Sequence, residues 1–308
     1  MDEAKCAVID LGSNTVHLAV FARADGRVIK LFSKKETVAL MGFVEEGAVT
    51  AEGERRLCSA VASLSALCRE RCGITPECIA TAALRNVSNG EAVASGVEAA
   101  SGIRPRIISG EEEAALGLFG LLGPRPWPYE SGAVCDFGGG SCELTSFENG
   151  EVVRSVSLAF GSLTLFRRFV PSLLPDRDAA ERISGFVEQQ LSSHMWLKGA
   201  ERLFAIGGTA RAASRLHAGL HKKRSPGNVY SIPADELSDL VEFIVKNEAA
   251  ALEELIRVAP NRLNTLPCGL SGLHALMSHT GARELIVGKP GIREGYACSK
   301  LCAVRGEV

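Results

Sequence analysis

The sequence has no long hydrophobic run and no basic leader. No window of about 18 residues is both apolar and free of charge, so we expect no membrane-spanning helix. The nearest candidate, residues 4–22, is interrupted by Lys5, Asp10, Asn14 and His17. The chain starts Met-Asp-Glu, whereas a secretory signal begins with basic residues. We therefore expect a cytoplasmic protein with no membrane partner.

Charge excess and closely paired cysteines are also missing. Lys and Arg total 34 and Asp and Glu total 36, which gives a net charge of −2 and no indication of a nucleic-acid partner. The ten cysteines are scattered and include no C-x-x-C pair. This pattern lacks zinc-finger spacing and favours small buried thiols in a reducing compartment.

Histidine clusters are sparse. His217 and His221 have helical i, i+4 spacing, but they form no H-E-x-x-H motif and no third ligand is evident in the sequence. We interpret them as residues on a helix surface. The basic segment that follows, residues 221–227, is either a solvated loop or a contact site for a polyanion.

The composition is otherwise that of a globular protein. Apolar residues make up 46% of the 308 residues and charged residues 23%, and this length suggests two domains. The segment 120–132 is rich in proline and glycine, which favours a domain boundary. We therefore expect an N-terminal domain over residues 1–124 and a C-terminal domain over residues 125–308.

One strand–turn–strand pattern occurs twice. In the first copy an apolar strand ends at Asp10, a glycine-containing turn follows, and two further strands form a hairpin. The second copy begins with the strand that ends at Asp136. The predicted strands are residues 6–10, 16–21 and 28–32 in the first half and residues 132–136, 142–147 and 151–158 in the second.

The parallel extends through the rest of each half. Helical patterns at 51–72 and 176–198 precede strands at 77–82 and 201–206, and a further strand and helix follow in each half. Each half therefore has the order β-β-β-α-β-α-β-α, an internal duplication. This order is similar to an α/β fold made of two duplicated actin-like ATPase (ribonuclease H-like) lobes, in which both turns face an interdomain cleft and bind phosphate.

The two turns carry the residues expected to bind phosphate. Glycine has no Cβ, so successive backbone amides can turn toward one anion. Each Asp at the end of its strand, Asp10 and Asp136, could hold a divalent cation beside that phosphate. The candidate phosphate-binding residues are Gly12, Ser13, Asn14, Gly138, Gly139, Gly140 and Ser141.

Acidic and basic candidates for catalysis lie at other strand ends. Glu111, Glu112 and Glu113 open a helical run, where negative charge is also favoured by the helix dipole alone. Glu143 follows the second glycine turn and suits a base or a metal ligand. Arg85 follows another strand, and its planar guanidinium matches phosphate oxygens.

Seven stretches together resemble the exopolyphosphatase / guanosine pentaphosphate phosphohydrolase (Ppx/GppA) family. They occur in the family's order over nearly the whole chain. The stretches are VIDLGSNTVHL at 8–18, ATAALRNVSN at 80–89, IISGEEEA at 107–114, VCDFGGGSCEL at 134–144, SLAFGSLTL at 157–165, AIGGTAR at 205–211 and VGKPGIREG at 287–295.

The resemblance implies a phosphoanhydride hydrolase that uses Mg²⁺ or Mn²⁺. It implies Glu113 as the catalytic base, Asp136 and Glu143 as the acids around the second loop, and Arg85 as a phosphate contact. Two residues depart from the family pattern, since Cys142 replaces a usual Thr and His17 replaces a frequent Arg. The chain resembles the short, two-domain form of the family.

The expected reaction is exopolyphosphatase hydrolysis of the terminal phosphoryl group of inorganic polyphosphate, with short chains favoured. Guanosine pentaphosphate is the alternative substrate. A kinase of the same fold is a further alternative, because Gly207, Gly208 and Thr209 resemble an adenosine-side loop. A non-enzymatic polyphosphate sensor is disfavoured because Glu113, Asp136 and Glu143 are all present. The assembly, monomer or homodimer, stays open.

Overall fold

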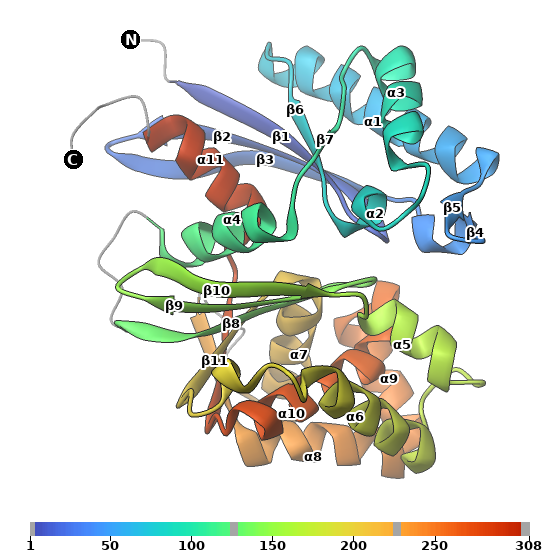
Figure 1. Cartoon of the computed structure of the whole chain (residues 1–308), viewed down its shortest axis with the longest axis vertical. Coiled ribbons are helices and arrows are strands. Elements are labelled where there is room, and N and C mark those ends of the chain that lie inside the picture. Colours follow the sequence, from blue (N-terminus) through green and yellow to red (C-terminus); the bar gives the residue numbers. More distant parts are fainter. Residues whose placement is uncertain (1–3, 124–128, 224–228, 303–308) are drawn as a thin grey trace. The chain divides into compact units, whose positions relative to one another are not determined.

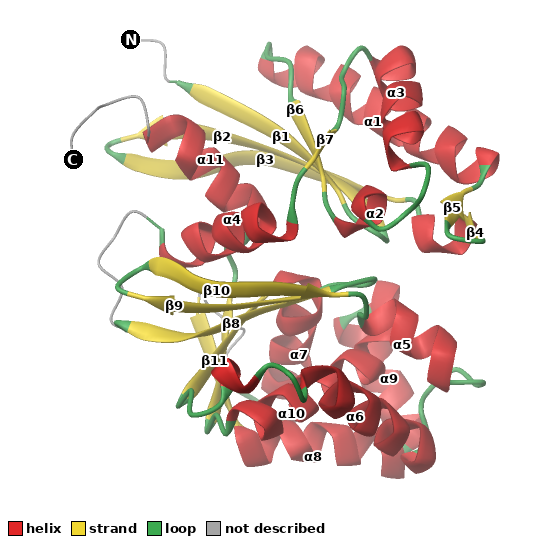
Figure 2. Cartoon of the chain, viewed as in Figure 1, coloured by secondary structure: helices red, strands yellow, loops and turns green. Residues whose placement is uncertain are grey.

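The chain folds into two compact α/β units. The computed structural model describes residues 4–123, 129–223 and 229–302. One unit comprises Met1–Pro126 together with Ile292–Val308, and the other comprises Trp127–Gly291 (Figure 1). Each unit is built on one large sheet with helices packed against it, and the first unit also has a small two-stranded sheet (Figure 2). The α/β fold with two duplicated lobes, expected from the sequence, is confirmed.

The first unit is built on a five-stranded sheet of order β3-β2-β1-β6-β7. Three antiparallel strands come first, and β6 and β7 then run parallel to β1. Six of the seven residues of β1 are buried, as in a strand covered on both faces. The strands are β1 (Lys5–Leu11), β2 (Thr15–Ala24), β3 (Arg27–Thr37), β6 (Glu77–Ala80) and β7 (Arg106–Ile107).

Alternate side chains of β1 pack into two separate cores. Ile9 and Leu11 face a core shared with α1 and α3, whereas Val8 faces a core shared with α11. The helices of this unit are α1 (Ala51–Cys72), α2 (Ala82–Arg85), α3 (Gly90–Ser101), α4 (Gly110–Leu122) and α11 (Ile292–Cys302), with a short connection formed by η1 (Leu40–Phe43), β4 (Val44–Glu45) and β5 (Ala48–Val49).

The second unit repeats this sheet and adds one strand, giving the order β10-β9-β8-β11-β13-β12. The first five positions match the first unit, which confirms the duplication. The added edge strand β12 runs antiparallel to β13 and was not expected from the sequence. The strands are β8 (Ser131–Phe137), β9 (Cys142–Glu148), β10 (Glu151–Leu158), β11 (Arg202–Ile206), β12 (Val229–Pro233) and β13 (Glu284–Gly288).

A single large core holds the second unit together. It joins the sheet to the most buried helix of the chain, α10 (Thr265–Thr280), and to the helices around it. The other helices are α5 (Ser162–Phe169), α6 (Arg177–Leu191), η2 (Met195–Leu197), α7 (Gly207–Leu220), α8 (Ala234–Lys246), α9 (Glu248–Val258) and η3 (Pro260–Arg262). Across the described residues, no helix combines the length and apolarity that a membrane span requires.

The final helix, α11, belongs to the first unit, although we expected the second domain to continue to residue 308. Ile292 and Tyr296 of α11 share a core with Val8, and Gly295 lies against the backbone carbonyl of Leu116 in α4. The chain therefore returns to its starting unit because an apolar face of that sheet needs a cover. The expected boundary at 124/125 falls within residues 124–128, outside the described part.

Gly295→Ala should destabilise the first unit. A Cβ at this position would overlap the Leu116 carbonyl and force α11 away from α4. We expect a loss of about 1–3 kcal/mol, the usual cost of overpacking. Urea unfolding would measure it. The control is Gly185→Ala in α6, where a Cβ meets nothing within 4 Å and should add about 0.5–1 kcal/mol. Equal midpoints for the two variants would contradict the packing account.

Candidate active site

The first glycine turn connects β1 to β2, and hydrogen bonds fix the direction of its peptide groups. The Ser13 carbonyl accepts from the Met41 amide (N···O 3.3 Å) and the Asn14 carbonyl accepts from the Ala39 amide (2.9 Å). In a trans peptide the C=O and the next N–H point in opposite directions. The Asn14 amide therefore points away from the segment that holds the Ser13 carbonyl.

The second glycine turn, between β8 and β9, is fixed in the same way by the start of α5. The Gly138 carbonyl accepts from the backbone amide of Ser162, and the Gly139 carbonyl accepts from that of Leu163, both at 2.9 Å. The amides of Gly139 and Gly140 consequently point away from α5. Successive backbone amides that face one side of a turn are the donors that anion-binding turns use.

Gly161 makes this arrangement possible, and its role was missed at the level of sequence. A Cβ at Gly161 would lie 2.6 Å from the Gly138 carbonyl oxygen and 2.7 Å from the Gly139 carbonyl carbon. Only glycine lets the turn approach the helix start this closely. The signal was present in the stretch SLAFGSLTL, but sequence alone did not show that its glycine lies against the second glycine turn.

The two acids beside the second turn, Asp136 and Glu143, lie directly opposite each other on β8 and β9. Opposed residues in an antiparallel pair place their side chains on one face. Glu143 is buried and accepts a hydrogen bond from the Ser157 hydroxyl (O···O 2.8 Å). Asp136 lies against the backbone of Gly207, so two carboxylates and the start of α7 share one location.

Of the three adjacent acids at the start of α4, only Glu113 pairs with Arg85. Their N···O distance is 2.8 Å, and their side chains are only 10% and 18% exposed. Arg85 also donates to the Ile108 carbonyl (3.1 Å). Glu112 pairs instead with Arg106 on a more exposed face. The structure thus separates Glu113 from its neighbours.

Glu111 has the role expected for an acid in a first helical turn. The pKa of Glu111 is held below its usual range, mainly by a hydrogen bond from its own backbone and to a lesser extent by one from the Ser109 hydroxyl. Ser109 is the N-cap of α4 and accepts from the Glu112 amide. Glu111 and Glu112 therefore serve the helix and its surface, whereas Glu113 lies in a buried ion pair.

Asp10, predicted as a metal ligand, forms a buried ion pair with Arg293 of α11 (N···O 2.7 Å). Both side chains are 12% exposed, and the Arg293 Nε atom is buried with no partner among the described atoms. Arg293 was not singled out from the sequence. Its stretch, VGKPGIREG, was quoted for the resemblance, but its contact with Asp10 depends on α11 returning to the first unit.

The predicted adenosine-side loop is formed by Gly207, Gly208 and Thr209 at the start of α7. Gly207 has a φ of 85°, which favours glycine, and Gly208 lies directly beneath the Arg262 guanidinium. Thr209 is fully buried and packs against Gly269. A cation therefore covers this loop, and Thr209 is a packing residue.

Arg262 belongs to a group of arginines that sequence reasoning missed. Burial lowers the pKa of Arg262, and the neighbouring cations Arg211 and Arg215 lower it further, while Asp136 opposes the shift. Arginine stays protonated even so. Several positive charges close to one carboxylate favour the binding of an additional anion here.

The two departures from the family pattern have clear locations. Cys142 is fully buried with its Sγ 3.8 Å from that of Cys135, and burial raises the pKa of the Cys142 thiol well above its ordinary value. Cys142 is therefore a packing residue behind the glycine turn. His17 lies opposite Asp10 in the β1–β2 register.

The interpretation of His217 as a surface residue is wrong. Its side chain is completely buried and bonds to Tyr230 and Glu236, because β12 and α8 cover this end of α7. Lys223, from the basic segment, pairs with Glu236. The remainder of that segment, residues 224–228, lies outside the described residues.

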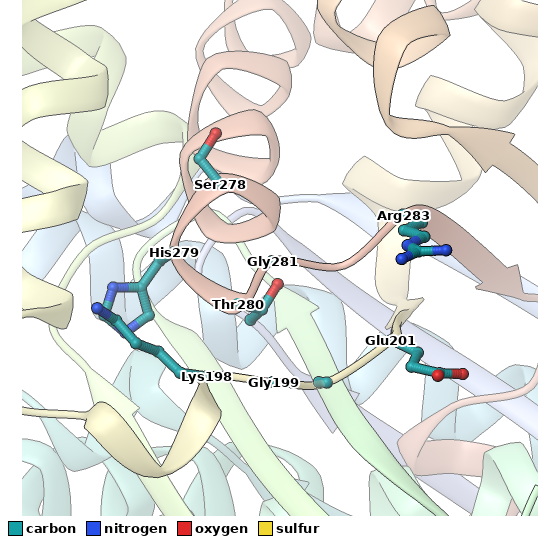
Figure 3. Close-up of a pocket in the computed structure, with 9 residues that line it drawn as sticks. Lys198, Gly199, Glu201, Ser278, His279, Thr280, Gly281 and Arg283 are labelled. Carbon is teal, nitrogen blue, oxygen red and sulfur yellow. The ribbon is translucent and has the colours of Figure 1, made fainter.

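A pocket of about 470 Å³ lies elsewhere in the second unit. Lys198 and Glu201 line it just before β11, and His279 and Arg283 line it around the end of α10 (Figure 3). These residues precede β11 and β13, whereas the candidate loops follow β8 and β11 at their carboxyl ends. The pocket is therefore separate from the candidate active site.

Comparison with known proteins identifies the family. The sequence profile of the "Ppx/GppA phosphatase family" matches residues 19–303. Exopolyphosphatase 1 of Mycobacterium tuberculosis is 26% identical over 306 residues, which cover 96% of this chain and 88% of the relative. Exopolyphosphatase 1 of Mycobacterium leprae is also 26% identical, over 96% of this chain and 89% of that protein.

Solved structures agree in fold. An exopolyphosphatase from Cytophaga hutchinsonii superposes with a TM-score of 0.83 at 20% identity, covering 98% of this chain and 99% of the other. The Ppx/GppA family member of Aquifex aeolicus gives a TM-score of 0.80 at 20% identity with the same coverage. The chain therefore belongs to the Ppx/GppA phosphatase family and is a phosphoanhydride hydrolase with its two-lobed, actin-like fold.

Proposed function

We propose that this enzyme is an exopolyphosphatase that hydrolyses the terminal phosphoryl group of inorganic polyphosphate and prefers short chains. The observation that carries the proposal is the buried ion pair of Glu113 and Arg85. It holds the proposed proton acceptor, Glu113, 2.8 Å from Arg85, the cation proposed to contact phosphate. A binding module has no need of such a base, whereas hydrolysis requires one group to orient and deprotonate water.

The backbone turns supply the contacts to the phosphate chain in this proposal. Each turn is proposed to donate to phosphate oxygens through its own amides, that of Asn14 in the first unit and those of Gly139 and Gly140 in the second. Phosphoryl transfer spreads negative charge over those oxygens, so fixed donors stabilise the transition state without reorganising. Ser13 and Ser141 are proposed to add hydroxyl contacts.

Arg85 and Glu113 then divide the chemistry between them. Arg85 contacts the transferring phosphoryl group and, through its bond to the Ile108 carbonyl, keeps a fixed orientation. Glu113 accepts the proton of the attacking water, and the ion pair with Arg85 fixes where its carboxylate lies. Asp10 and Arg293 support the first turn from beneath in this scheme.

The donor set of the second unit fits Mg²⁺ or Mn²⁺. Asp136 and Glu143 present hard oxygen donors on the same face of two paired strands. Asp10 remains a predicted ligand, although its charge is already balanced by Arg293. When bound, the cation would neutralise charge on the phosphoryl oxygens.

Guanosine pentaphosphate is the alternative substrate, and a kinase reaction is the more distant one. The loop that resembles an adenosine-side loop is covered at Gly208 by the Arg262 guanidinium. This cation suits a phosphate oxygen, whereas a nucleobase commonly needs an apolar slot. Together with the exopolyphosphatase names of the curated relatives, the placement of Arg262 favours polyphosphate.

The test is phosphate release from short polyphosphate, long polyphosphate and guanosine pentaphosphate, measured side by side without any acceptor. The proposal expects the highest kcat/KM for short polyphosphate. Higher kcat/KM for guanosine pentaphosphate would support the alternative substrate. Release only when a sugar or carboxylate acceptor is added would replace hydrolysis by a kinase reaction.

Glu113→Gln should abolish most turnover while substrate still binds. The amide keeps the size of the side chain but cannot accept the proton, so we expect kcat to fall by roughly 10²–10⁴-fold. The matched control is Glu112→Gln in the same helical turn, which loses only its exposed pair with Arg106. Steady-state kinetics that show similar kcat values for the two variants would exclude Glu113 as the base.

Asp136→Asn should raise the Mg²⁺ concentration needed for half-maximal activity. A neutral amide is a weaker ligand for a hard cation than a carboxylate. The control is Asp178→Asn in α6, an exposed acid that pairs with Arg182. Mg²⁺ and Mn²⁺ titrations of activity would measure the effect, and an unchanged midpoint for Asp136→Asn would rule out this ligand.

Gly161→Ala should impair substrate binding by displacing the second turn. The new methyl group would overlap the Gly138 and Gly139 carbonyls and so rotate the adjacent amides away from the phosphate. We expect a drop in kcat/KM of about 10²–10³-fold, the cost of losing one transition-state donor. Gly185→Ala should retain wild-type kinetics. Wild-type kcat/KM in a folded Gly161→Ala protein would refute this use of the turn.

A further inference from the structure

A cluster of metal-ligating side chains lies at the far end of α7, away from the phosphate loops. His217 lies in the last turn of α7, His221 is the C-cap residue that follows this helix, and Glu236 lies in the first turn of α8. One ligand atom from each of these three residues lies within 4.8 Å of the others. His217 is completely buried, Glu236 is half-buried and His221 is exposed, so the cluster is fixed on one side and open to solvent on the other.

We propose that His217, His221 and Glu236 form a binding site for a borderline divalent transition metal, of which Zn²⁺ is the best match. Two imidazoles and one carboxylate are a common zinc ligand set. Zinc–ligand bonds of about 2.0–2.2 Å place tetrahedral ligand atoms roughly 3.3 Å apart. His221 would therefore need to approach the other two groups by about 1.5 Å at most, whereas His217 Nε2 and Glu236, which already contact each other, would need to move apart. Water would complete the coordination from the solvent side.

Tyr230 gives the site the outer contact that metal-bound histidines usually have. The His217 Nε2 atom contacts Glu236, and its other ring nitrogen, Nδ1, lies 2.8 Å from the Tyr230 hydroxyl. With the metal on Nε2, the Nδ1–H would donate to that hydroxyl, which fixes both the tautomer and the orientation of the ring. Because Tyr230 fixes the ring through Nδ1, the Nε2 atom of the buried His217 is already oriented to bind a metal.

Lys223 would compete with the metal for the Glu236 carboxylate. Its ammonium group lies 2.8 Å from the Glu236 carboxylate, the oxygen that the metal would use. The metal would therefore replace the exposed ion pair of Lys223 with Glu236 and the direct contact of His217 with the same carboxylate oxygen. This competition predicts that removal of the lysine charge will strengthen metal binding.

The metal would join three elements of the second unit, α7, β12 and α8. His217 lies ten positions after Gly207, or about 15 Å along the helix axis from the loop that starts α7. The site is thus separate from Asp136 and Glu143. Its expected consequence is stability, because a metal that binds only the folded state raises the unfolding temperature.

The test uses the full chain, freed of any affinity tag, in a buffer with excess Mg²⁺ to occupy hard oxygen sites. Zn²⁺ is titrated by calorimetry, and Co²⁺ is added separately to detect the visible absorption of a tetrahedral histidine site. The proposal expects one Zn²⁺ per chain, a higher Tm and the Co²⁺ band. Absence of stoichiometric Zn²⁺ binding overturns it.

Variants of ligand residues that are not fully buried test the site without disturbing the fold. His221→Ala and Glu236→Gln should each weaken Zn²⁺ affinity at least about 10-fold, and Tyr230→Phe about 10–100-fold. Lys223→Met should strengthen it by about two- to five-fold. His279→Ala, which changes a histidine in the separate pocket, should bind like wild type. Wild-type affinity in His221→Ala, or weaker binding in Lys223→Met, overturns the site.

Discussion

The fixed direction of a few peptide groups is the constraint on which the candidate active site depends. In each unit, carbonyl oxygens of a glycine-containing turn accept hydrogen bonds from a neighbouring segment of the same unit. Because the peptide is planar, each bonded carbonyl determines where the next amide points. In the proposed mechanism the amides of these turns are therefore oriented before any ligand binds, as electrostatic catalysis of phosphoryl transfer requires.

The two units achieve this in different ways. The first turn is held by residues 38–41, which connect β3 to η1 and begin that short helix, whereas the second is held by the N-terminal amides of α5. The second arrangement demands close approach of two backbones, which explains Gly161. The charged groups also differ, since buried ion pairs of Glu113 and Asp10 lie in the first unit, and Arg262 with its neighbouring arginines lies in the second. One duplicated framework thus carries different chemistry in each half.

Local patterns in the sequence were sufficient to predict the duplicated framework. Apolar strands that end in Asp and run into glycine turns depend only on neighbouring residues, so both turns and the five strands shared by the two sheets could be predicted, whereas the edge strand β12 could not. Arg293, Arg262 and Gly161 could not be assigned roles, because each acts through a contact with a distant segment. The same reason explains the errors at α11 and His217, whose burial depends on elements that the local pattern does not specify.

Backbone NMR of the Gly139 and Gly140 amides offers the most direct test of this account. The enzyme would be titrated with triphosphate and Mg²⁺, and the amide proton shifts of both glycines followed together with that of Asn14. The account predicts saturable downfield shifts at these amides and none at Gly26 or Gly150, which lie in the hairpin turns at the other end of the strands. Triphosphate that binds without moving the Gly139 and Gly140 signals would contradict it.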